Sequence, residues 1–125
     1  MERVLLCALL VSLACSRTPH PAIQRIAVLP FENLSGDASL DWIAEAAPSL
    51  VVFDLTGAPS TFAMRVLTLR DAYLQHATRF LHGSVTRHGA ELRFEIELED
   101  ASRHKMVATR EIEGPVLTAM NGSPP

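Results

Sequence analysis

The sequence holds few of the residues from which reactive sites are built. It has two cysteines, one tryptophan and one tyrosine among 125 residues. Its eleven lysines and arginines are scattered among fourteen acids, so no basic stripe is available to replace counterions along nucleic-acid phosphates. After residue 15, no apolar run reaches the roughly 20 residues that a membrane-spanning helix needs. These shortages exclude a nucleic-acid binder, and the sequence predicts no enzyme, no cofactor and no metal site.

The first fifteen residues have the layout of a bacterial export signal. A polar start at residues 1–3 precedes an apolar run over residues 4–14. That run is too short to cross a bilayer core of about 30 Å as a helix. Small Ala14 then precedes Cys15, as at a signal cleavage site. We therefore expect residues 1–14 to be a signal peptide that is removed.

The ending Ser12-Leu13-Ala14-Cys15 resembles a lipoprotein signal, in which a peptidase cuts before a diacylated cysteine. In this interpretation Cys15 is lipidated and anchors the chain to a membrane, while Cys7 leaves with the signal. No thiol then remains for a disulfide, a metal or a nucleophile. Ser16 implies, by the same resemblance, an outer-membrane protein facing the periplasm rather than one of the inner membrane. A plain secretory signal and a buried amino-terminal segment are the alternatives.

The next residues predict a tether and then a first strand. Residues 15–23 contain Pro19 and Pro21, which cannot continue a helix, and have little to bury. Residues 24–31 form a compact apolar run containing Pro30, which lacks an N–H and can close a strand. Residues 32–37 are polar and have turn chemistry.

From residue 39 onward the apolar spacing becomes helical. One face carries residues at spacings of four, three, four and four: Leu40, Ala44, Ala47, Val51 and Leu55. Asp37 or Ser39 can cap this helix by accepting a backbone N–H. Pro48 interrupts it, since an interior proline costs about 3 kcal/mol. We expect a kink there, or two short helices, before the segment ends at residues 57–59.

The second half of the chain reads as strands around a short helix. Residues 61–66, 80–86, 91–99 and 104–112 predict strands, and Thr68 with Asp71 resembles a capping box. The face of that helix would be lined by Leu69, Ala72, Tyr73, His76 and Ala77. Residues 91–99 alternate strictly between apolar and charged side chains, which is typical of a strand with one dry and one wet face. The expected fold is α/β, with a mixed sheet in the order βαβα followed by an antiparallel three-stranded meander and helices packed on one face.

Three segments resemble the TolB-like amino-terminal domain family, which includes FlgO-like bacterial envelope lipoproteins. They are residues 26–37 (IAVLPFENLSGD), residues 80–85 (FLHGSV, where an acid more often stands at His82) and residues 101–104 (ASRH). The likeness covers a domain over residues 24–114, followed by a flexible tail at 115–125. It implies a periplasmic lipoprotein, or a module found beside tetratricopeptide arrays, cyclases or kinases. The family supplies no catalytic residues.

The chemically suggestive residues each have a plainer structural interpretation. The five histidines show no recognised zinc spacing, so surface or edge positions are favoured: His20, His76, His82, His88 and His104. Asp41 and Glu45 are expected on a solvated helix face rather than in a catalytic cleft. Aligned acids on residues 95–99 suggest open water or a basic partner, and simple solvation is favoured.

Two features could serve recognition. The polar loop provides Asn33, Ser35, Gly36 and Asp37 as a possible recognition loop, although a turn with a helix cap explains the same residues. Trp42 lies beside the apolar helix stripe and is either a packed side chain or a partner anchor, because tryptophan is enriched at interface hot spots.

The sequence thus predicts a non-enzymatic cell-envelope lipoprotein that binds or scaffolds an unidentified envelope protein and is held at the membrane through Cys15. The main alternative is a ligand-sensing or signalling module, suggested by the family's cyclase and kinase associations. An envelope hydrolase that uses His82 or His104 is the least favoured hypothesis.

Overall fold

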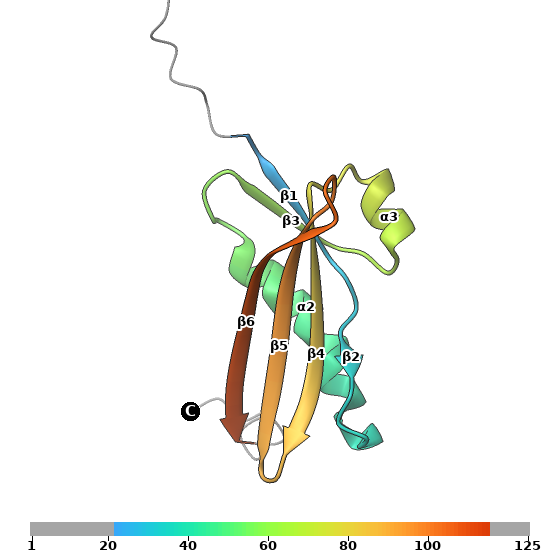
Figure 1. Ribbon diagram of the computed structural model, residues 1–125, viewed down its shortest axis with the longest axis vertical. Helices are drawn as coiled ribbons and strands as arrows, with labels where there is room; N and C mark the ends of the chain where they lie inside the picture. Colours follow the sequence, from blue (N-terminus) through green and yellow to red (C-terminus); the bar gives the residue numbers. More distant parts are fainter. Residues whose placement is uncertain (1–21, 116–125) are drawn as a thin grey trace, which may run out of the picture.

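A mixed sheet of six strands organises the part of the chain that the structure describes, residues 22–115 (Figure 1). The structure is a computed structural model. The predicted signal peptide, Cys15 and residues 116–125 of the predicted tail lie outside the described residues. The elements, in chain order, are β1 (Gln24–Val28), β2 (Glu32–Asn33), the 3-10 helix η1 (Ala38–Leu40), α2 (Asp41–Leu55), β3 (Thr61–Arg65), α3 (Leu69–Leu74), β4 (Arg79–His88), β5 (Glu91–Asp100) and β6 (Lys105–Pro115).

The strand order confirms the predicted fold class. The sheet runs β3-β1-β4-β5-β6, and β2 pairs with β4 outside this path. Strand β1 is parallel to β3 and β4, whereas β4, β5 and β6 form an antiparallel meander. The predicted first strand is shorter than expected: it ends at Val28, and β2 begins after Pro30 and Phe31. No helix among residues 22–115 is both long and apolar enough to cross a membrane.

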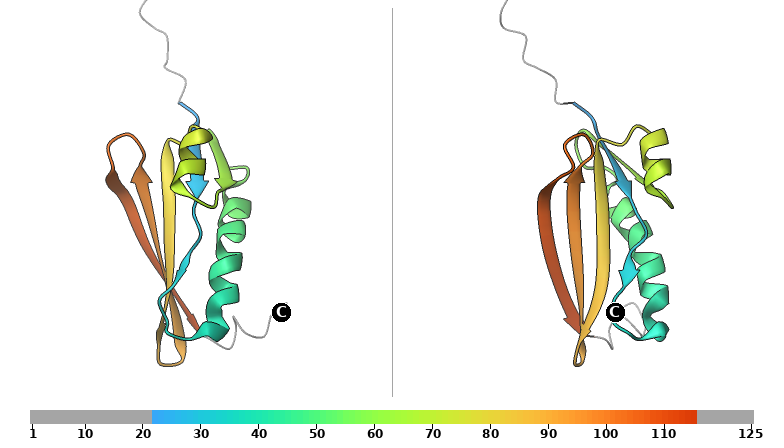
Figure 2. Two further views of the ribbon diagram at one scale, coloured as in Figure 1. Left: turned by 90° about the vertical axis from the view of Figure 1, so that its right-hand side faces the viewer. Right: turned by 45° about the vertical axis from the view of Figure 1, so that its right-hand side comes forward.

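The sheet has two differently covered faces. The α2 face carries Val28, Leu81 and Leu92, which form a buried cluster with Leu40 and Ala44. Helix α2 lies along this face (Figure 2). The predicted buried face of this helix is confirmed, because its other members pack there too: Ala47, Val51 and Leu55.

The opposite side, here called the α3 face, carries a smaller cluster. Ala72 of α3 packs there with Ala27, Phe80 and Ala101. The expectation that both helices cover one face is therefore corrected, since α2 and α3 belong to clusters on opposite sides of the sheet.

The strand order explains this placement. The crossover through α2 leads from β1 to β3, and the crossover through α3 leads back past β1 to β4. Crossovers between parallel strands are right-handed in nearly all proteins. Two right-handed crossovers that run in opposite directions along a sheet place their helices on opposite faces. The sequence pattern shows each helix but not the direction of its crossover.

Helix α2 continues through Pro48, so the predicted division into two short helices is wrong. Pro48 cannot donate to the carbonyl one turn earlier, which destabilises a helix interior. Its side chain is fully buried. Tertiary burial of the proline ring offsets the local loss and keeps the helix in one piece.

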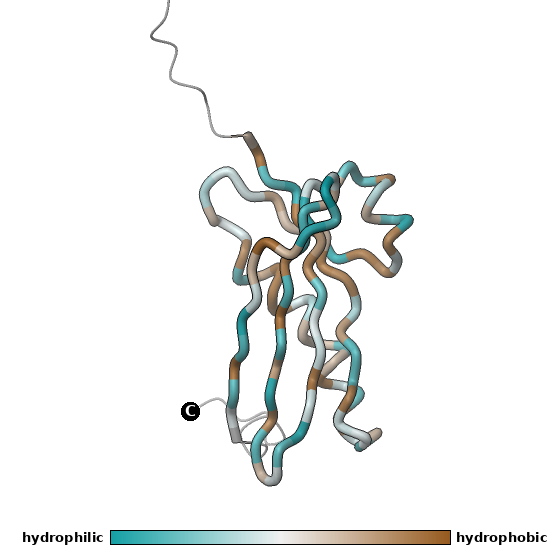
Figure 3. Tube along the Cα trace, viewed as in Figure 1, coloured by the Kyte–Doolittle hydropathy of each residue, from teal (hydrophilic) through white to brown (hydrophobic). Residues whose placement is uncertain are grey.

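Hydrophobic and hydrophilic residues alternate along β5, as predicted (Figure 3). Its apolar residues Phe94, Ile96 and Leu98 pack against the cluster of the α2 face. Opposite β4, Glu99 pairs with Phe80 and Glu97 with His82, and directly paired residues lie on the same face. The glutamates of β5 therefore lie on the α3 face.

Candidate functional site

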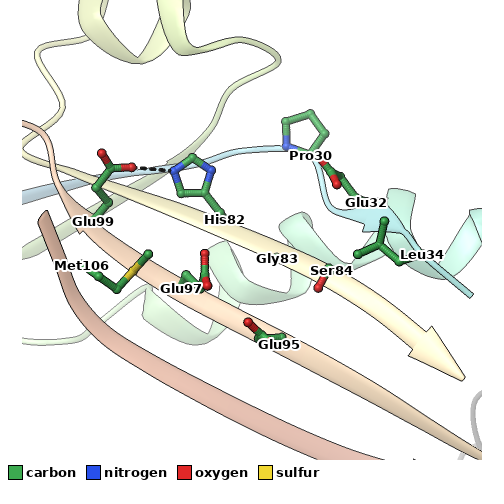
Figure 4. Close-up of a pocket in the computed structure, with 10 residues that line it drawn as sticks. All are labelled: Pro30, Glu32, Leu34, His82, Gly83, Ser84, Glu95, Glu97, Glu99 and Met106. Carbon is green, nitrogen blue, oxygen red and sulfur yellow. Dashed lines mark hydrogen bonds and ion pairs between the residues drawn. The ribbon is translucent and has the colours of Figure 1, made fainter. Parts of the chain in front are cut away.

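A shallow cleft of about 360 Å³ lies on the part of the α3 face that α3 leaves uncovered (Figure 4). Strands β2, β4, β5 and β6 and the segment before β2 contribute its lining: Pro30, Glu32, Leu34, His82, Gly83, Ser84, Glu95, Glu97, Glu99 and Met106. Because side chains alternate along strands, Glu95, Glu97 and Glu99 of β5 all project into it. The cleft thus combines four carboxylates with one histidine.

Glu99 is the carboxylate that contacts histidine. Its Oε2 lies 3.0 Å from Nε2 of His82, and its Oε1 lies 3.4 Å from Nδ1 of His104. His82 is partly buried and hydrogen-bonded to Glu99. Figure 4 shows the His82 ring directed toward Glu99.

The four glutamates make the cleft suited to attracting cations. No group of three or more His, Cys, Asp or Glu side chains in residues 22–115 is placed to hold a metal ion. Ser84 is the only hydroxyl among the lining residues, and no described hydrogen bond joins it to His82. The geometry therefore provides negative charge and a hydrogen-bonded histidine, without a nucleophile paired to a base.

The predicted recognition loop is held by its own hydrogen bonds. The Asn33 amide donates to the Asp37 carbonyl at 2.9 Å and to a carboxylate oxygen of Asp41 at 2.7 Å. The Ser35 hydroxyl donates to the Asn33 side-chain oxygen and accepts from the Asp37 N–H at 3.1 Å. Gly36 has φ of +75°, a conformation that other residues adopt at a cost. These four predicted residues are therefore brought together, mainly to shape the turn.

Asp37 caps η1, the short 3-10 helix that leads into α2, whereas α2 itself follows Leu40 and has no side-chain cap. The Asp37 carboxylate accepts from the N–H and hydroxyl of Ser39 at 2.9 and 2.7 Å, at the start of η1. The Ser39 hydrogen bonds lower the pKa of Asp37, and the Arg87 guanidinium, 3.1 Å away, lowers it further. These contacts favour the charged form of the Asp37 carboxylate, which therefore stabilises the folded loop.

Trp42 is half exposed and belongs to an apolar stripe that sequence analysis missed. Ala46, Leu50 and Phe53 follow it at helical spacings of four, four and three residues, which places all four on one side of α2. The exposed fractions are 50% for Trp42, 64% for Leu50 and 76% for Phe53. We call these four residues the α2 stripe. Their spacing is visible in the sequence. It was missed because the helix has a second apolar face, the buried one, and only that face was assigned from the sequence.

Acidic residues flank the α2 stripe on both sides. At 100° per residue, Glu45 lies on one flank and Asp54 on the other. Glu45 pairs with Arg65 of β3 at 2.7 Å. Asp41, which we expected beside Glu45 on a solvated face, accepts a hydrogen bond from Asn33. Neither Asp41 nor Glu45 lines the cleft, so these two carboxylates are not part of that site.

No protein-family model matches the sequence, and no curated protein matches it. Several solved structures resemble the fold. The lipoprotein GNA1162 from Neisseria meningitidis has 15% identity and a TM-score of 0.58, over 73% of this chain and 79% of that chain. The LpoB C-terminal domain from Escherichia coli has 12% identity and a TM-score of 0.61, over 84% and 92%.

TolB from Acinetobacter baumannii is similar as well, with 15% identity and a TM-score of 0.52. The match covers 80% of this chain and 25% of TolB, so it concerns one part of that protein. At these identities the likeness shows a common fold. The chain therefore shares its fold with a lipoprotein and with a portion of TolB.

Proposed function

We propose that this chain is a non-enzymatic envelope lipoprotein whose α/β domain binds another envelope protein. The leader pattern supports a lipid on Cys15 and an outer-membrane location facing the periplasm. The shared fold with a lipoprotein supports the same assignment. The observation that carries the binding role is the α2 stripe, an exposed apolar surface on a rigid helix.

The composition of the α2 stripe indicates what kind of partner fits it. Trp42 and Phe53 are large aromatic side chains that bind strongly when a partner removes them from water. Glu45 and Asp54 on the flanks, and no lysine or arginine within α2, favour a partner with basic flanks. An amphipathic helix with apolar side chains between lysines or arginines satisfies both requirements. A second copy of α2 would bring like charges together.

Site-specific photo-cross-linking in cells tests the binding surface. A photoreactive residue at position 50 should give a discrete cross-linked product, and the product's partner peptide should be apolar with basic flanks. Trp42→Ala and Phe53→Ala should reduce that product about tenfold or more, because loss of a hot-spot side chain costs about 2 kcal/mol. The same probe at Val107, exposed on β6, is the control. Equal products from positions 50 and 107 would refute the surface.

Metabolic labelling with palmitate tests the anchor. The wild-type chain and the Cys7→Ala variant should both incorporate label and fractionate with membranes. Cys15→Ala should lose the label, since no acyl chain is then attached to provide about 0.8 kcal/mol of membrane affinity per buried CH₂. Label that persists in Cys15→Ala would disprove lipidation at this position.

A second function, ligand sensing, is favoured by the cleft on the α3 face. Its four carboxylates suit a cationic small molecule and repel nucleotides. A ligand at a hundredfold excess over its Kd should stabilise the domain by about 2.7 kcal/mol. Thermal unfolding with polyamines and with nucleotides measures this directly, and an unchanged melting temperature throughout would remove the sensing role.

A further inference from the structure

We propose that one end of this domain rests on the surface of the membrane and binds anionic lipid headgroups. This end, here called the amino end, consists of residues 22–25, 57–62, 74–79 and 101–105. It lies where the described chain begins, at the top of Figure 1. The proposal rests on the proposed lipid anchor and adds to it the orientation of the domain.

Backbone hydrogen bonds hold the four segments of the amino end together. The Gln24 N–H donates to the Ser60 carbonyl at 2.8 Å, and the Thr78 N–H donates to the Arg25 carbonyl at 2.8 Å. The Ala101 N–H donates to the Thr78 carbonyl at 3.1 Å. The amino end is therefore one ordered surface, built from loops that are distant in sequence.

Large apolar side chains are exposed on this surface. Ile23 is 65% exposed, Phe62 51% and Leu74 66%. The Arg25 guanidinium lies 5.0 Å from the centre of the Phe62 ring, so cationic and aromatic groups are adjacent. Apolar side chains beside cations are the composition that inserts at the boundary between headgroups and acyl chains.

The uncompensated charge of the amino end is positive. Within residues 22–115, Arg25, Arg103 and Lys105 take part in none of the observed ion pairs. Arg79 pairs with Asp100 at 2.7 Å and so contributes no net charge. Exposed cations next to apolar groups are attracted to anionic lipids, and salt weakens that attraction.

The opposite end of the domain and one side of α2 carry acidic residues instead. The far end of the β4–β5 hairpin contains Glu91, and the nearby start of α2 contains Asp41. Asp54, on one flank of the α2 stripe, takes part in none of the ion pairs observed within residues 22–115, whereas Glu45 on the other flank is paired with Arg65. An anionic bilayer would repel these surfaces, so charge complementarity selects the amino end.

The length of chain before the domain limits how far this end can be from the bilayer. Six residues lie between Cys15 and Ala22, the first described residue, so seven Cα-to-Cα steps connect the two. Fully extended, these steps span at most about 25 Å. A lipid on Cys15 would therefore keep the amino end close to the headgroups, where weak contacts suffice because no further translational freedom is lost.

Fluorescence quenching tests the orientation on the acylated full-length product. After signal removal, Cys15 is acylated, so a thiol introduced by Leu74→Cys is the single labelling site for an environment-sensitive dye. In phosphatidylethanolamine–phosphatidylglycerol vesicles with brominated acyl chains, we expect at least threefold more quenching at position 74 than at position 50. Leu50→Cys is a matched control, because its side chain is equally exposed on α2.

Charge reversal supplies the second measurement. Arg103→Glu combined with Lys105→Glu should at least halve the quenching at position 74, as should vesicles of neutral phosphatidylcholine. The melting temperature should stay unchanged, because both side chains are exposed. Equal quenching at positions 74 and 50 would overturn the proposal. A dye at position 74 that responds to an envelope protein but not to vesicles would also overturn it, in favour of a protein interface.

Mass spectrometry of the same sample separates this proposal from the anchor. A product without acyl chains contradicts lipidation of Cys15. Quenching at position 74 is then measured at higher lipid concentration on the chain that also carries Cys7→Ala and Cys15→Ala, so that the dye still labels one thiol. A response greater than that at position 50 still supports the surface. Absence of that response overturns the surface as well.

Discussion

Gly83 shows how one missing side chain shapes the core. It lies on β4, and a Cβ at this position would collide with the ring of Phe31. Phe31 is buried in the cluster of the α2 face. The Phe31 ring therefore packs directly against the backbone of β4. Only glycine permits this close approach between ring and backbone.

Gly83→Ala should lower the free energy of unfolding by about 1–3 kcal/mol, because the ring must move out of a filled core. Urea denaturation measures the change. Gly114→Ala is the matched control, since a Cβ there meets nothing within 4 Å and the position also lies in a strand. If both variants unfold at the same urea concentration, the contact between Gly83 and the Phe31 ring does not contribute to stability.

Asp100 links stability to pH. Hydrogen bonds from the Ser102 side chain and the Arg103 backbone, together with Arg79, lower its pKa from 3.8 to about 2. The charged form is favoured in the folded state. Its contribution is thus fully present above pH 4 and is lost as the pH falls toward 2.

Asp100→Asn should flatten this part of the pH dependence. Between pH 4 and pH 2, the wild-type chain should lose more unfolding free energy than the variant, and the gap between them should be constant from pH 5 to 7. Urea denaturation at each pH gives both curves. Parallel curves below pH 4 would show that Asp100 is not the group responsible.

Sequence reasoning found part of the candidate site at this scale. The polar loop was correctly assigned to a turn with a cap, because Asn33, Ser35 and Asp37 bond to neighbours in sequence. The glutamates of β5 were assigned to one face by their alternation. The cleft itself was not predictable, since it requires β2 to be placed beside β4, a pairing between distant residues.

At the scale of elements, helix α3 depends on its cap. Thr68 accepts from the Asp71 N–H at 3.1 Å, and the Asp71 carboxylate accepts from the Thr68 N–H at 3.1 Å. The predicted capping box is confirmed. The predicted packing face is confirmed in part. Ala72 is fully buried, Ala77 packs against the same cluster and Tyr73 contacts Phe80. Leu69 and His76 are exposed, and the helix ends at Leu74, before His76 and Ala77. So short a helix draws little stability from packing, which makes the cap important.

Thr68→Ala should lower the free energy of unfolding by about 1 kcal/mol through loss of the accepted N–H. Thr68→Ser keeps the hydroxyl and should retain most of the wild-type value. Thermal unfolding of the three chains side by side makes the comparison. A serine variant as unstable as the alanine variant would assign the effect to the lost methyl group instead.

At the scale of the whole molecule, the fold class was predictable and the placement of the helices was not. Alternation in β5 and the run in β1 predicted the strands, because a buried sheet face imposes its period on the sequence. The two clusters pack on opposite faces of the same sheet, with Val28 in one and its neighbour Ala27 in the other. We therefore expect the domain to unfold as one unit.

Phe80→Leu tests this cooperativity. Phe80 is buried on the α3 face and contacts Tyr73 edge-to-face, with ring centroids 5.2 Å apart. Trp42 lies on α2, on the other side of the sheet. The substitution should cost about 1–3 kcal/mol and shift the Trp42 fluorescence transition and the circular-dichroism transition together. A Trp42 transition that stays in place would reveal two independently unfolding halves.

The hairpin of β4 and β5 also fixes the height of the molecule. Each strand has ten residues, which at roughly 3.4 Å per residue is about 34 Å from the amino end to the far turn. Deleting two facing residues from each strand would lower that turn by about 7 Å and leave every remaining side chain on its own face. Deleting one residue from each strand would move every side chain between the deletion and the turn to the opposite face of the sheet. The length of this hairpin can therefore change only in steps of two residues per strand.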